Sequence, residues 1–376
     1  MGNQQGPMES LVMHFLFDGI YKNKTVLITG HTGFKGSWLA YWLQQMGANV
    51  IGYSLDAPTH PNHFELLNLD MVSIIGDIRD LEKLNATFAT YKPDIVFHLA
   101  AQALVRFSYV DPIETYETNV MGTLKVFEAC RKHQVKAIVN ITSDKAYENK
   151  EWLWGYRESD PMGGYDPYSS SKGCADLLAS SYRNSYFNLH GYQKSHHTLL
   201  ASCRAGNVVG GGDWAQDRLM SDIMISISHG DKVTIRNPKA IRPWQHVLEP
   251  LSGYLRVGQK LLEEKVEFGE AWNFGPSDED SISVEEVVLH VKQYWDKIDY
   301  EIKQVPNQLH EANLLKLDCS KAHTLLKWKN VWDSKRTFER TVLWYKSFYE
   351  ENNILTLNDL TCYVSDAKCK GLSWTN

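Results

Sequence analysis

The chain has 376 residues and a mass of 43.1 kDa, which is too long for one ordinary small domain and fits a large α/β unit with a smaller lobe. Hydrophobic residues make up 43% and charged residues 22%, a composition that excludes a largely disordered chain. The net charge of -6 gives no field for nucleic acid, so an anionic ligand would need local basic residues and backbone amides.

The two ends of the chain and the cysteines bear on its location. The six cysteines are scattered without a Cys-x-x-Cys pair, which favours reduced thiols and a cytoplasmic protein. The apolar stretch 11–20 is short and interrupted by His14 and Asp18, so neither a signal peptide nor a membrane span is predicted. Residues 1–23 are predicted to be an N-terminal extension and residues 351–376 a C-terminal tail, both outside the fold.

The first half of the chain alternates short apolar runs with helical stretches. The predicted strands are 25–29, 49–54, 72–75, 95–99, 136–142 and 199–205. The predicted helices are 37–45, 81–90, 115–133 and 168–186. This βα repeat predicts an α/β fold with a doubly wound parallel sheet of the Rossmann type, mainly in residues 24–205. Residues 206–350 are predicted to form a smaller, interleaved substrate-binding lobe, with segments that return to the sheet.

A glycine-rich turn separates the first predicted strand from the first predicted helix. It reads Gly30-His31-Thr32-Gly33-Phe34-Lys35-Gly36, with three-residue spacing that differs from Gly-x-Gly-x-x-Gly. The glycines allow a tight turn, let the backbone approach a pyrophosphate and let the helix pack closely on the strand. The N-terminus of the helix then offers unpaired N–H groups to the phosphates. A structural turn without a ligand is the alternative interpretation of this motif alone.

Residues after the later strands fit the same dinucleotide. Asp56 stands 20 positions after the last glycine of the turn, where a carboxylate accepts both ribose hydroxyls and repels a 2′-phosphate. This favours NAD over NADP, with a solvated loop aspartate as the alternative. Asp77 and Ile78 follow the third strand and are predicted to hold the adenine. The fourth strand ends in residues that leave room for the dinucleotide: Leu99, Ala100, Ala101 and Gln102.

The sequence Tyr168-Ser169-Ser170-Ser171-Lys172 puts a phenol and an ammonium four residues apart, on one face of a predicted helix. The ammonium and the positive nicotinamide ring favour the phenolate, so the pKa of Tyr168 is expected to move from about 10 toward neutrality. Tyr168 is therefore the predicted base. Lys172 is its partner and also reaches the nicotinamide ribose. The motif is common by chance, but here it follows a dinucleotide fold and a strand that ends in hydroxyl side chains.

That strand ends in Thr142-Ser143-Asp144-Lys145. The Ser143 hydroxyl is expected to bridge Tyr168 and the 4-hydroxyl of a sugar. Asp144 and Lys145 add an acid and a potential base next to the same substrate carbon. Because 4-epimerisation needs only the hydroxyl and the Tyr/Lys pair, the extra charged pair predicts a further proton-transfer step. Helix capping or surface exposure is the alternative for these two residues.

Taken together, these motifs resemble the extended short-chain dehydrogenase/reductase superfamily, and longer stretches resemble the bacterial CDP-glucose 4,6-dehydratases. The resemblance spans roughly residues 24–348. The matching stretches are GHTGFKGSWL, HLAAQALVR, NITSDKAY, WGYRESDPMGGYDPYSSSKG, RAGNVVGGGDWAQDR, IRPWQHVLEPLSGY, WNFGP and LKLDCSKA.

The resemblance implies an NAD-dependent hydro-lyase. CDP-glucose would be oxidised at C4, lose water across C5 and C6, and be reduced at C6, giving CDP-4-keto-6-deoxyglucose for deoxysugars such as those of the lipopolysaccharide O-antigen. The related dTDP-glucose dehydratases carry Thr-Asp-Glu at this strand end, with the glutamate as the C5 base. Asp144 resembles their acid. Lys145 takes the place of the base, and it would have to be largely neutral there because an ammonium accepts no proton.

Basic and amide side chains follow the later strands. By the resemblance, Asn207 contacts the diphosphate and Arg242 pairs with a nucleotide phosphate, which suits a guanidinium better than an ammonium. Arg106, Arg204 and Arg218 are further candidates for the sugar or the pyrophosphate. Surface salt bridges are the alternative for each arginine.

CDP-glucose is the predicted partner, with no nucleic acid and no membrane. No metal is predicted, because His196-His197 lacks a third ligand. The helices 115–133 and 168–186 resemble the pair that forms a four-helix contact in the superfamily, which implies a homodimer or homotetramer; covering the sheet is their alternative role. Three rival functions stay open: a nucleotide-sugar 4-epimerase, a dehydratase for another NDP-glucose, and a non-catalytic NAD-binding protein.

Overall fold

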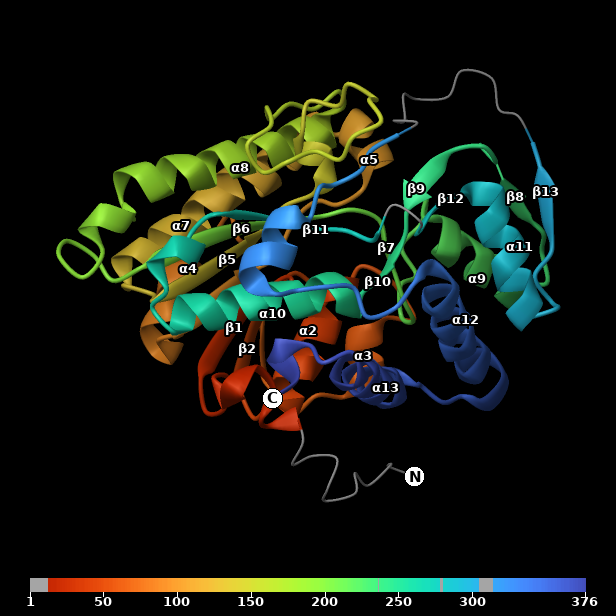
Figure 1. Ribbon diagram of the computed structural model, residues 1–376, viewed down its shortest axis with the longest axis horizontal. Coiled ribbons are helices and arrows are strands. Elements are labelled where there is room, and N and C mark those ends of the chain that lie inside the picture. The colour runs from red at the N-terminus through yellow and green to blue at the C-terminus, as the bar shows by residue number, and fades with distance from the viewer. Residues whose placement is uncertain (1–12, 236, 278–279, 304–313) are drawn as a thin grey trace.

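A computed structural model describes residues 13–235, 237–277, 280–303 and 314–376. Residues 1–12 of the predicted extension 1–23 therefore lie outside the described residues. The structure has a large sheet layer covered by helices and a smaller lobe beside it (Figure 1).

The large layer is a seven-stranded parallel sheet in the order β11-β6-β5-β4-β1-β2-β3. Its strands are β1 Thr25–Thr29, β2 Asn49–Ser54, β3 Val72–Ile75, β4 Ile95–His98, β5 Ala137–Ile141, β6 Leu199–Ala205 and β11 Ala271–Phe274. In β1, Val26 and Ile28 pack into the core on one face of the sheet while Leu27 packs into the core on the other. Burial on both faces explains why this strand is a continuous apolar run. The predicted fold class is confirmed.

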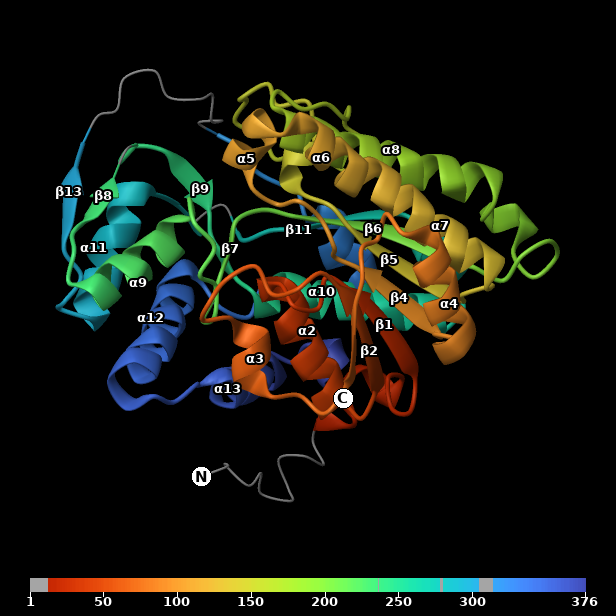
Figure 2. The same ribbon diagram turned by 180° about the vertical axis from the view of Figure 1, so that it is seen from behind.

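Helices cover both faces of the sheet, as Figure 2 shows from behind. On one face lie α2 Phe34–Gln45 and α10 Leu248–Leu262, and every residue of α10 from Leu248 to Gln259 is buried. On the other face lie α4 Leu81–Tyr91, α7 Thr123–Lys132 and α8 Pro167–Ser185. Within the described part of the chain, no helix combines the length and the apolar composition that a membrane span requires.

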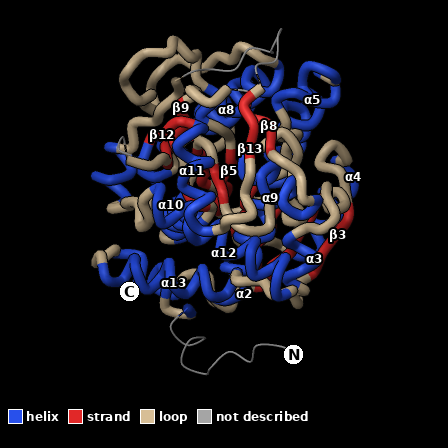
Figure 3. Tube along the Cα trace, turned by 90° about the vertical axis from the view of Figure 1, so that its right-hand side faces the viewer, coloured by secondary structure: helices blue, strands red, loops and turns tan. Residues whose placement is uncertain are grey.

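The smaller lobe is built from short strands and three helices, seen from its outer side in Figure 3. β8 Val233–Ile235 pairs with β13 Tyr300–Ile302, and β9 Ile241–Pro243 pairs with β12 Ser281–Ser283. α9 Leu219–His229 and α11 Val284–Tyr294 flank these pairs, and α12 Ser334–Glu351 packs on α11. β7 Val208–Val209 pairs with β10 Gln245–His246, which leads from this lobe back to α10 and the sheet.

The predicted helix 115–133 is not continuous. The structure has α6 Pro112–Tyr116, a π-helical segment η2 Glu117–Gly122, and then α7. α5 Val105–Val110 precedes them. Asn119 of η2 hydrogen-bonds the backbone of Gln102, in the loop that follows β4, so the departure from α-helical geometry coincides with a contact to this loop.

The prediction that residues 13–23 and 356–376 lie outside the fold is wrong. The short helix η1 Leu16–Gly19 and the long helix α13 Thr356–Cys369 both pack into the main core. Phe17 stacks on Trp374 with ring centroids 5.2 Å apart, and both side chains are fully buried. Tyr21 donates a hydrogen bond to the Leu255 carbonyl oxygen at 2.5 Å. The two ends of the described chain thus complete the core under α2 and α10.

Candidate active site

The turn Gly30–Gly36 joins β1 to α2 and is too tight for side chains at two of its glycines. Gly30 has a φ of +80°, and a Cβ there would lie 2.7 Å from the Ala100 backbone nitrogen. A Cβ on Gly36 would lie 2.1 Å from the Gly30 carbonyl oxygen. α2 begins at Phe34 after Gly33, so its first N–H groups have no side-chain cap. This cradle fits the pyrophosphate of a dinucleotide.

The other predicted cofactor residues lie around this turn. Thr32 Oγ1 lies 2.8 Å from Ser54 Oγ and donates to the Leu55 carbonyl oxygen at 3.0 Å, so it ties the turn to the end of β2. Asp56 is exposed just beyond that strand. Asp77 is paired with Arg79 at 2.6 Å, and the hydrogen bond from Arg79 holds the pKa of Asp77 below its ordinary value. Ile78 is buried.

Asn119 links the cofactor side of the site to the catalytic helix, and it was not predicted. Its Oδ1 accepts from the Gln102 N–H at 2.8 Å, and its Nδ2 donates to the Gln102 carbonyl oxygen at 3.0 Å and to Ser171 Oγ at 2.8 Å. Leu99, Ala100 and Ala101 are held in place between β4 and this bond, with Ala100 N donating to Thr29 Oγ1. Asparagine is a poor helix former, so its presence inside a predicted helix was the feature of the sequence that could have indicated its role.

The tip of β5 carries three of the predicted catalytic residues. Ser143 caps the short helix η3 Asp144–Ala146, and its hydroxyl donates to Asp144 Oδ1 at 2.9 Å. Asp144 is buried, and a Cβ on Gly206 would lie 2.9 Å from its Oδ2. Burial raises the pKa of Asp144, against the lowering influence of Lys145 and of the Ser143 hydrogen bond. A buried carboxyl with a raised pKa suits a proton donor.

Tyr168 and Lys172 lie on the first turns of α8, whose N-terminus is capped by Asp166 and begins with Pro167. Ser143 lowers the pKa of the Tyr168 phenol, so this helix lies beside the tip of β5. Lys172 is buried. The structure therefore brings together Ser143, Asp144, Tyr168 and Lys172, the central part of the predicted constellation.

The expected decrease in the pKa of Tyr168 is not produced by the protein groups alone. Burial raises this pKa to about 12, and Asp144 raises it further, while the Ser143 hydrogen bond and Arg218 act in the opposite direction. Burial also lowers the pKa of Lys172 to about 8, with a further contribution from Lys35. Desolvation thus disfavours the charged form of both groups, and a phenolate here needs positive charge in addition to that of the chain.

Lys35 of the glycine-rich turn belongs to the catalytic cluster as well as to the cofactor turn. Burial lowers its pKa to about 8, Arg218 lowers it further, and Asp144 and Asp213 oppose them. Lys35 also acts on Lys172, so two ammonium groups are close to one another at this edge of the sheet. Sequence spacing alone did not reveal this, because the two lysines come from different elements.

The predicted substrate-binding residues lie where the small lobe meets the sheet. Arg218 donates to Asp213 at 2.6 Å and also acts on Tyr168. Arg106 lies 3.5 Å from Asp217 and is about one-third exposed. Arg242 lies on β9, and the Asn207 carbonyl oxygen accepts from the Gln245 N–H just beyond that strand. Among these groups, Arg218 lies close enough to the catalytic cluster to act on Tyr168 and Lys35.

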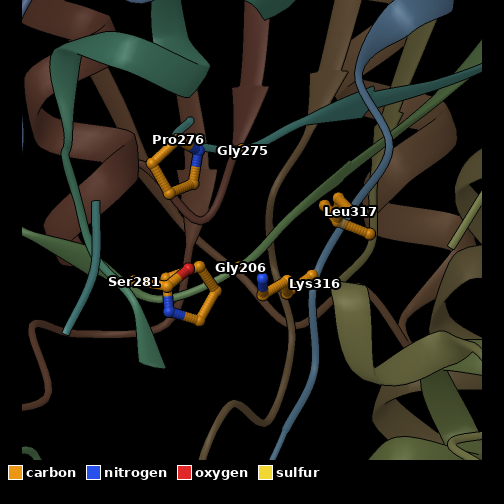
Figure 4. Close-up of a pocket in the computed structure, with 7 residues that line it drawn as sticks. Gly206, Gly275, Pro276, Ser281, Lys316 and Leu317 are labelled. Atoms are coloured by element: carbon orange, nitrogen blue, oxygen red, sulfur yellow. The ribbon is translucent and has the colours of Figure 1, made fainter. Parts of the chain in front are cut away.

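A small pocket borders the same cluster, between the two lobes (Figure 4). Its lining comes from the ends of β6 and β11, from β9 and β12, and from a late loop: Gly206, Pro243, Gly275, Pro276, Ser281, Lys316 and Leu317. Gly206 separates this pocket from the Asp144 carboxylate, since only a glycine fits there without contacting Oδ2.

Arg204 does not bind substrate in this geometry, which corrects the prediction. Its side chain is 5% exposed and is paired with Asp176, with both guanidinium donors at 3.0 Å. Its remaining terminal nitrogen donates to the Tyr147 hydroxyl at 2.6 Å and to the Glu158 carbonyl oxygen. The guanidinium donates all of these hydrogen bonds to groups inside the protein, so it is not available to a substrate phosphate. Sequence position after a strand did not distinguish this role from phosphate binding.

No group of three or more His, Cys, Asp or Glu side chains could hold a metal ion in the described residues. His196 Nε2 lies 2.8 Å from the Asn188 carbonyl oxygen, a contact within its own loop.

Known proteins resemble the chain both in sequence and in fold. The family model of GDP-mannose 4,6 dehydratase matches residues 27–341. The CDP-glucose 4,6-dehydratase of Salmonella typhimurium is 55% identical over 350 residues, covering 92% of this chain and 97% of that protein. The UDP-glucose 4-epimerase of Halalkalibacterium halodurans is 26% identical and covers 85% of this chain and 95% of its own length.

Solved structures share the fold at lower sequence identity. The UDP-glucose 4-epimerase of Thermotoga maritima, solved with UDP-glucose, superposes with a TM-score of 0.75 at 22% identity and covers 87% of this chain and 100% of its own. The UDP-glucose 4-epimerase of Brucella ovis, solved in complex with NAD, gives a TM-score of 0.72 at 22% identity and covers 85% and 97%.

Proposed function

The chain belongs to the family of nucleotide-sugar 4,6-dehydratases, and from this premise we propose that it converts CDP-D-glucose to CDP-4-keto-6-deoxy-D-glucose and water. One observation carries the proposal. Asp144 and Lys145 stand at the tip of β5, next to the Ser143 hydroxyl, which donates to Asp144 and lowers the pKa of Tyr168. A dehydration needs a proton donor and a base beside the oxidising pair, and this arrangement supplies both.

NAD is the proposed cofactor. The cradle at Gly30 and Gly36 would hold its pyrophosphate, Asp56 its adenosine ribose, Asp77 and Ile78 its adenine, and Lys172 its nicotinamide ribose. When bound, NAD would take hydride from the sugar at C4 and return it at C6, so it is recycled in each turnover.

Tyr168 is proposed to take the proton of the sugar 4-hydroxyl, with the Ser143 hydroxyl placed between them. The buried ammonium of Lys172 stabilises the resulting phenolate, because it lies one helical turn away on the same face of α8. The pKa of about 12 that Tyr168 has in the protein alone means that the base becomes effective only after a cationic ligand has entered.

Asp144 is proposed to protonate the departing 6-hydroxyl. Burial raises its pKa, so the proton that it carries is available inside a closed site. Lys145, as the neutral amine that this step requires, is the proposed base for the C5 proton, by its position next to Asp144. The two side chains would then act on the C5–C6 bond, one giving and one taking a proton, and water leaves.

The diphosphate is proposed to bind to Arg242, Asn207 and Arg218, with Arg106 at the outer edge of the site. Arg218 is paired with Asp213 and still acts on Tyr168, so it lies between the phosphates and the reacting sugar. A guanidinium group can donate two parallel hydrogen bonds to two phosphate oxygens, so an arginine both orients the phosphate and neutralises its charge.

Four-helix assembly is proposed as the oligomer contact, giving a homodimer or homotetramer. The surface of α5, α6, η2 and α8 exposes several large apolar side chains, with Val110 80%, Ile113 76% and Leu177 57% exposed. Apolar side chains gathered on neighbouring helices are typical of a protein interface. The cytoplasmic location stays a prediction, based on cysteines that form no disulfide in the described residues.

The proposal is tested by incubating the protein and NAD with CDP-, dTDP-, GDP- and UDP-glucose in parallel. We expect a 4-keto-6-deoxy product from CDP-glucose alone. Formation of CDP-galactose would identify a 4-epimerase, the function of several relatives with this fold. Turnover of another nucleotide sugar in place of CDP-glucose would identify a dehydratase for that nucleotide. NAD binding without any turnover would favour the non-catalytic alternative.

A further inference from the structure

Asp176 is a buried carboxylate one helical turn beyond Lys172 on α8, and it takes no part in the mechanism above. Its side chain is 1% exposed. Oδ2 accepts from Thr142 Oγ1 at 2.6 Å and from Arg204 Nε at 3.0 Å, and Oδ1 accepts from Arg204 Nη2 at 3.0 Å. Both oxygens are therefore engaged, and the arginine binds them as a bidentate fork.

Arg204 is itself held from three sides. Nη1 donates to the Tyr147 hydroxyl at 2.6 Å and to the Glu158 carbonyl oxygen at 3.1 Å, and the guanidinium carbon lies 4.8 Å from the centre of the Tyr147 ring. Tyr147 in turn donates to Asn273 Oδ1 at 2.8 Å, on the edge strand β11. Asp176 is thus bonded to a rigid part of the sheet and has little room to move.

The bond from Thr142 has a direct geometric consequence. Thr142 immediately precedes Ser143 at the tip of β5, while Asp176 follows Tyr168 and Lys172 at four-residue spacing on α8. The Thr142–Asp176 hydrogen bond therefore joins the strand that carries the acid to the helix that carries the phenol. It sets how far the Ser143 hydroxyl lies from Tyr168.

The charge of Asp176 also acts on Lys172. Lys35 from α2 and Asp176 from α8 act on the Lys172 ammonium, and Lys172 in turn acts on His98 from β4. Burial and Lys35 lower the pKa of Lys172 to about 8, and Asp176 opposes them. Among the described residues, the charged groups that face Asp176 itself are Lys172, Arg204 and Arg183, with the Cys203 thiol nearby.

We propose that Asp176 is a positioning residue of the dehydratase reaction, one that locks the tip of β5 to α8 and sets a fixed negative charge beside the Lys172 ammonium. This inference rests on the proposed function. Lys172 stays cationic at the pH of turnover because Asp176 balances Lys35, and the acid and the phenol keep their separation because Thr142 is tied to the same carboxylate.

The charge is tested with Asp176→Asn in the full chain, by titrating [15N]lysine-labelled protein and assigning the Lys172 signal with Lys172→Arg. We expect the pKa of Lys172 to fall by about one unit relative to the wild type. In a single turnover with CDP-glucose, the alkaline limb of NADH formation is expected to move to lower pH by the same amount. An unchanged Lys172 titration would overturn the electrostatic role.

Two further variants separate charge from fold. Asp176→Asn/Arg204→Met removes both charges, so it avoids an unpaired buried arginine, and the Lys172 pKa should still be lowered. This double variant decides the question where the single one fails to fold. Asp359→Asn breaks another buried ion pair, with Arg340, far from the site. It controls for lost stability and should leave the Lys172 titration at its wild-type value.

The geometric role is tested with Thr142→Val, which removes the hydroxyl and keeps the charge of Asp176. The rate of NADH formation is expected to fall about tenfold with the alkaline limb in its wild-type place. A wild-type rate would overturn the positioning by Thr142. If the wild-type protein turned over no nucleotide sugar, the proposed function would fail, whereas the titration of Lys172 would still decide the role of Asp176.

Discussion

Two regions of the molecule bury ionisable groups, and they hold them differently. In the C-terminal core, the Glu249 carboxylate of α10 accepts from the N–H groups of Val331 and Trp332 and from the Tyr363 hydroxyl, at 2.7 to 3.1 Å. At the catalytic edge of the sheet, Lys35 lies close enough to Lys172 to lower the pKa of its ammonium.

The comparison distinguishes an ionisable group that is buried for stability from one that is buried at the candidate active site. Glu249 is buried and has a raised pKa, yet its oxygens are satisfied by backbone and hydroxyl donors, so it fixes the segment 331–332 to α10. The catalytic edge combines like charges, a buried acid and a phenol beside a pocket. A shifted pKa value alone does not identify a functional site. Buried groups of like charge, which an oppositely charged ligand would neutralise, are the stronger indication.

The largest expected effect is on the catalytic side of this comparison. Tyr168→Phe removes the proton acceptor for the sugar 4-hydroxyl, and we expect turnover of CDP-glucose to fall by about 10⁴-fold. NADH absorbance in a single turnover measures the oxidation, and calorimetry checks that NAD still binds. A normal oxidation rate in this variant would refute the role of Tyr168.

Asp144→Asn tests the buried acid. The variant keeps the shape of the side chain and loses its proton, so elimination should slow by about 10³-fold while oxidation at C4 continues. NADH is then expected to accumulate, which stopped-flow absorbance detects. Elimination at the wild-type rate would assign the acid to another group.

Lys145→Met tests the base that was placed by resemblance. Exchange of the C5 proton of the sugar with deuterated solvent should fall at least about 10²-fold, because the variant loses the amine that is proposed to take this proton. Mass spectrometry of the recovered nucleotide sugar measures it. Persistent exchange would move the base elsewhere in the cluster.

Glu249→Gln tests the structural role of the buried carboxyl group in the C-terminal core. Burial raises the pKa of Glu249 to about 7, so the folded chain keeps a proton that the unfolded chain releases above about 4.5. Its contribution to the free energy of unfolding therefore decreases as the pH rises through this window. Between pH 5 and pH 7 the stability of the variant relative to wild type should rise by about 2 kcal/mol.

Urea unfolding at the two pH values measures this difference. Glu82→Gln, at an exposed position of α4, serves as the matched control and should follow the wild-type pH dependence. Parallel curves for Glu249→Gln and wild type would show that Glu249 does not titrate in this window. Turnover should be unaffected, since Glu249 lies in the C-terminal core.

The strands of the sheet were predictable, and β1, β2, β3 and β6 have the predicted bounds, because buried parallel strands are short apolar runs between turns. The packing of Phe17 against Trp374 was not, since the two residues lie at opposite ends of the sequence and only the fold brings them together. The candidate cluster at Ser143, Asp144, Tyr168 and Lys172 followed from motifs.

Sequence motifs could not predict which side chains bond to an element that is distant in the sequence. Arg204 was expected at the substrate, but its partner Asp176 lies on another helix, and only the fold brings the two together. Asn119 and the second role of Lys35 escaped for the same reason. Local patterns identify elements and short constellations, while long-range pairs depend on the sheet order.

Trp38 gives the protein an internal optical sensor. It lies two residues beyond Gly36 on the helix that begins at the cofactor turn, fully buried and stacked on His63 with ring centroids 4.9 Å apart. Reduced nicotinamide absorbs in the range in which buried indoles emit, so energy transfer from Trp38 should dim its fluorescence whenever the proposed cofactor is in the reduced state. Unlabelled protein would thus display its own redox cycle during turnover.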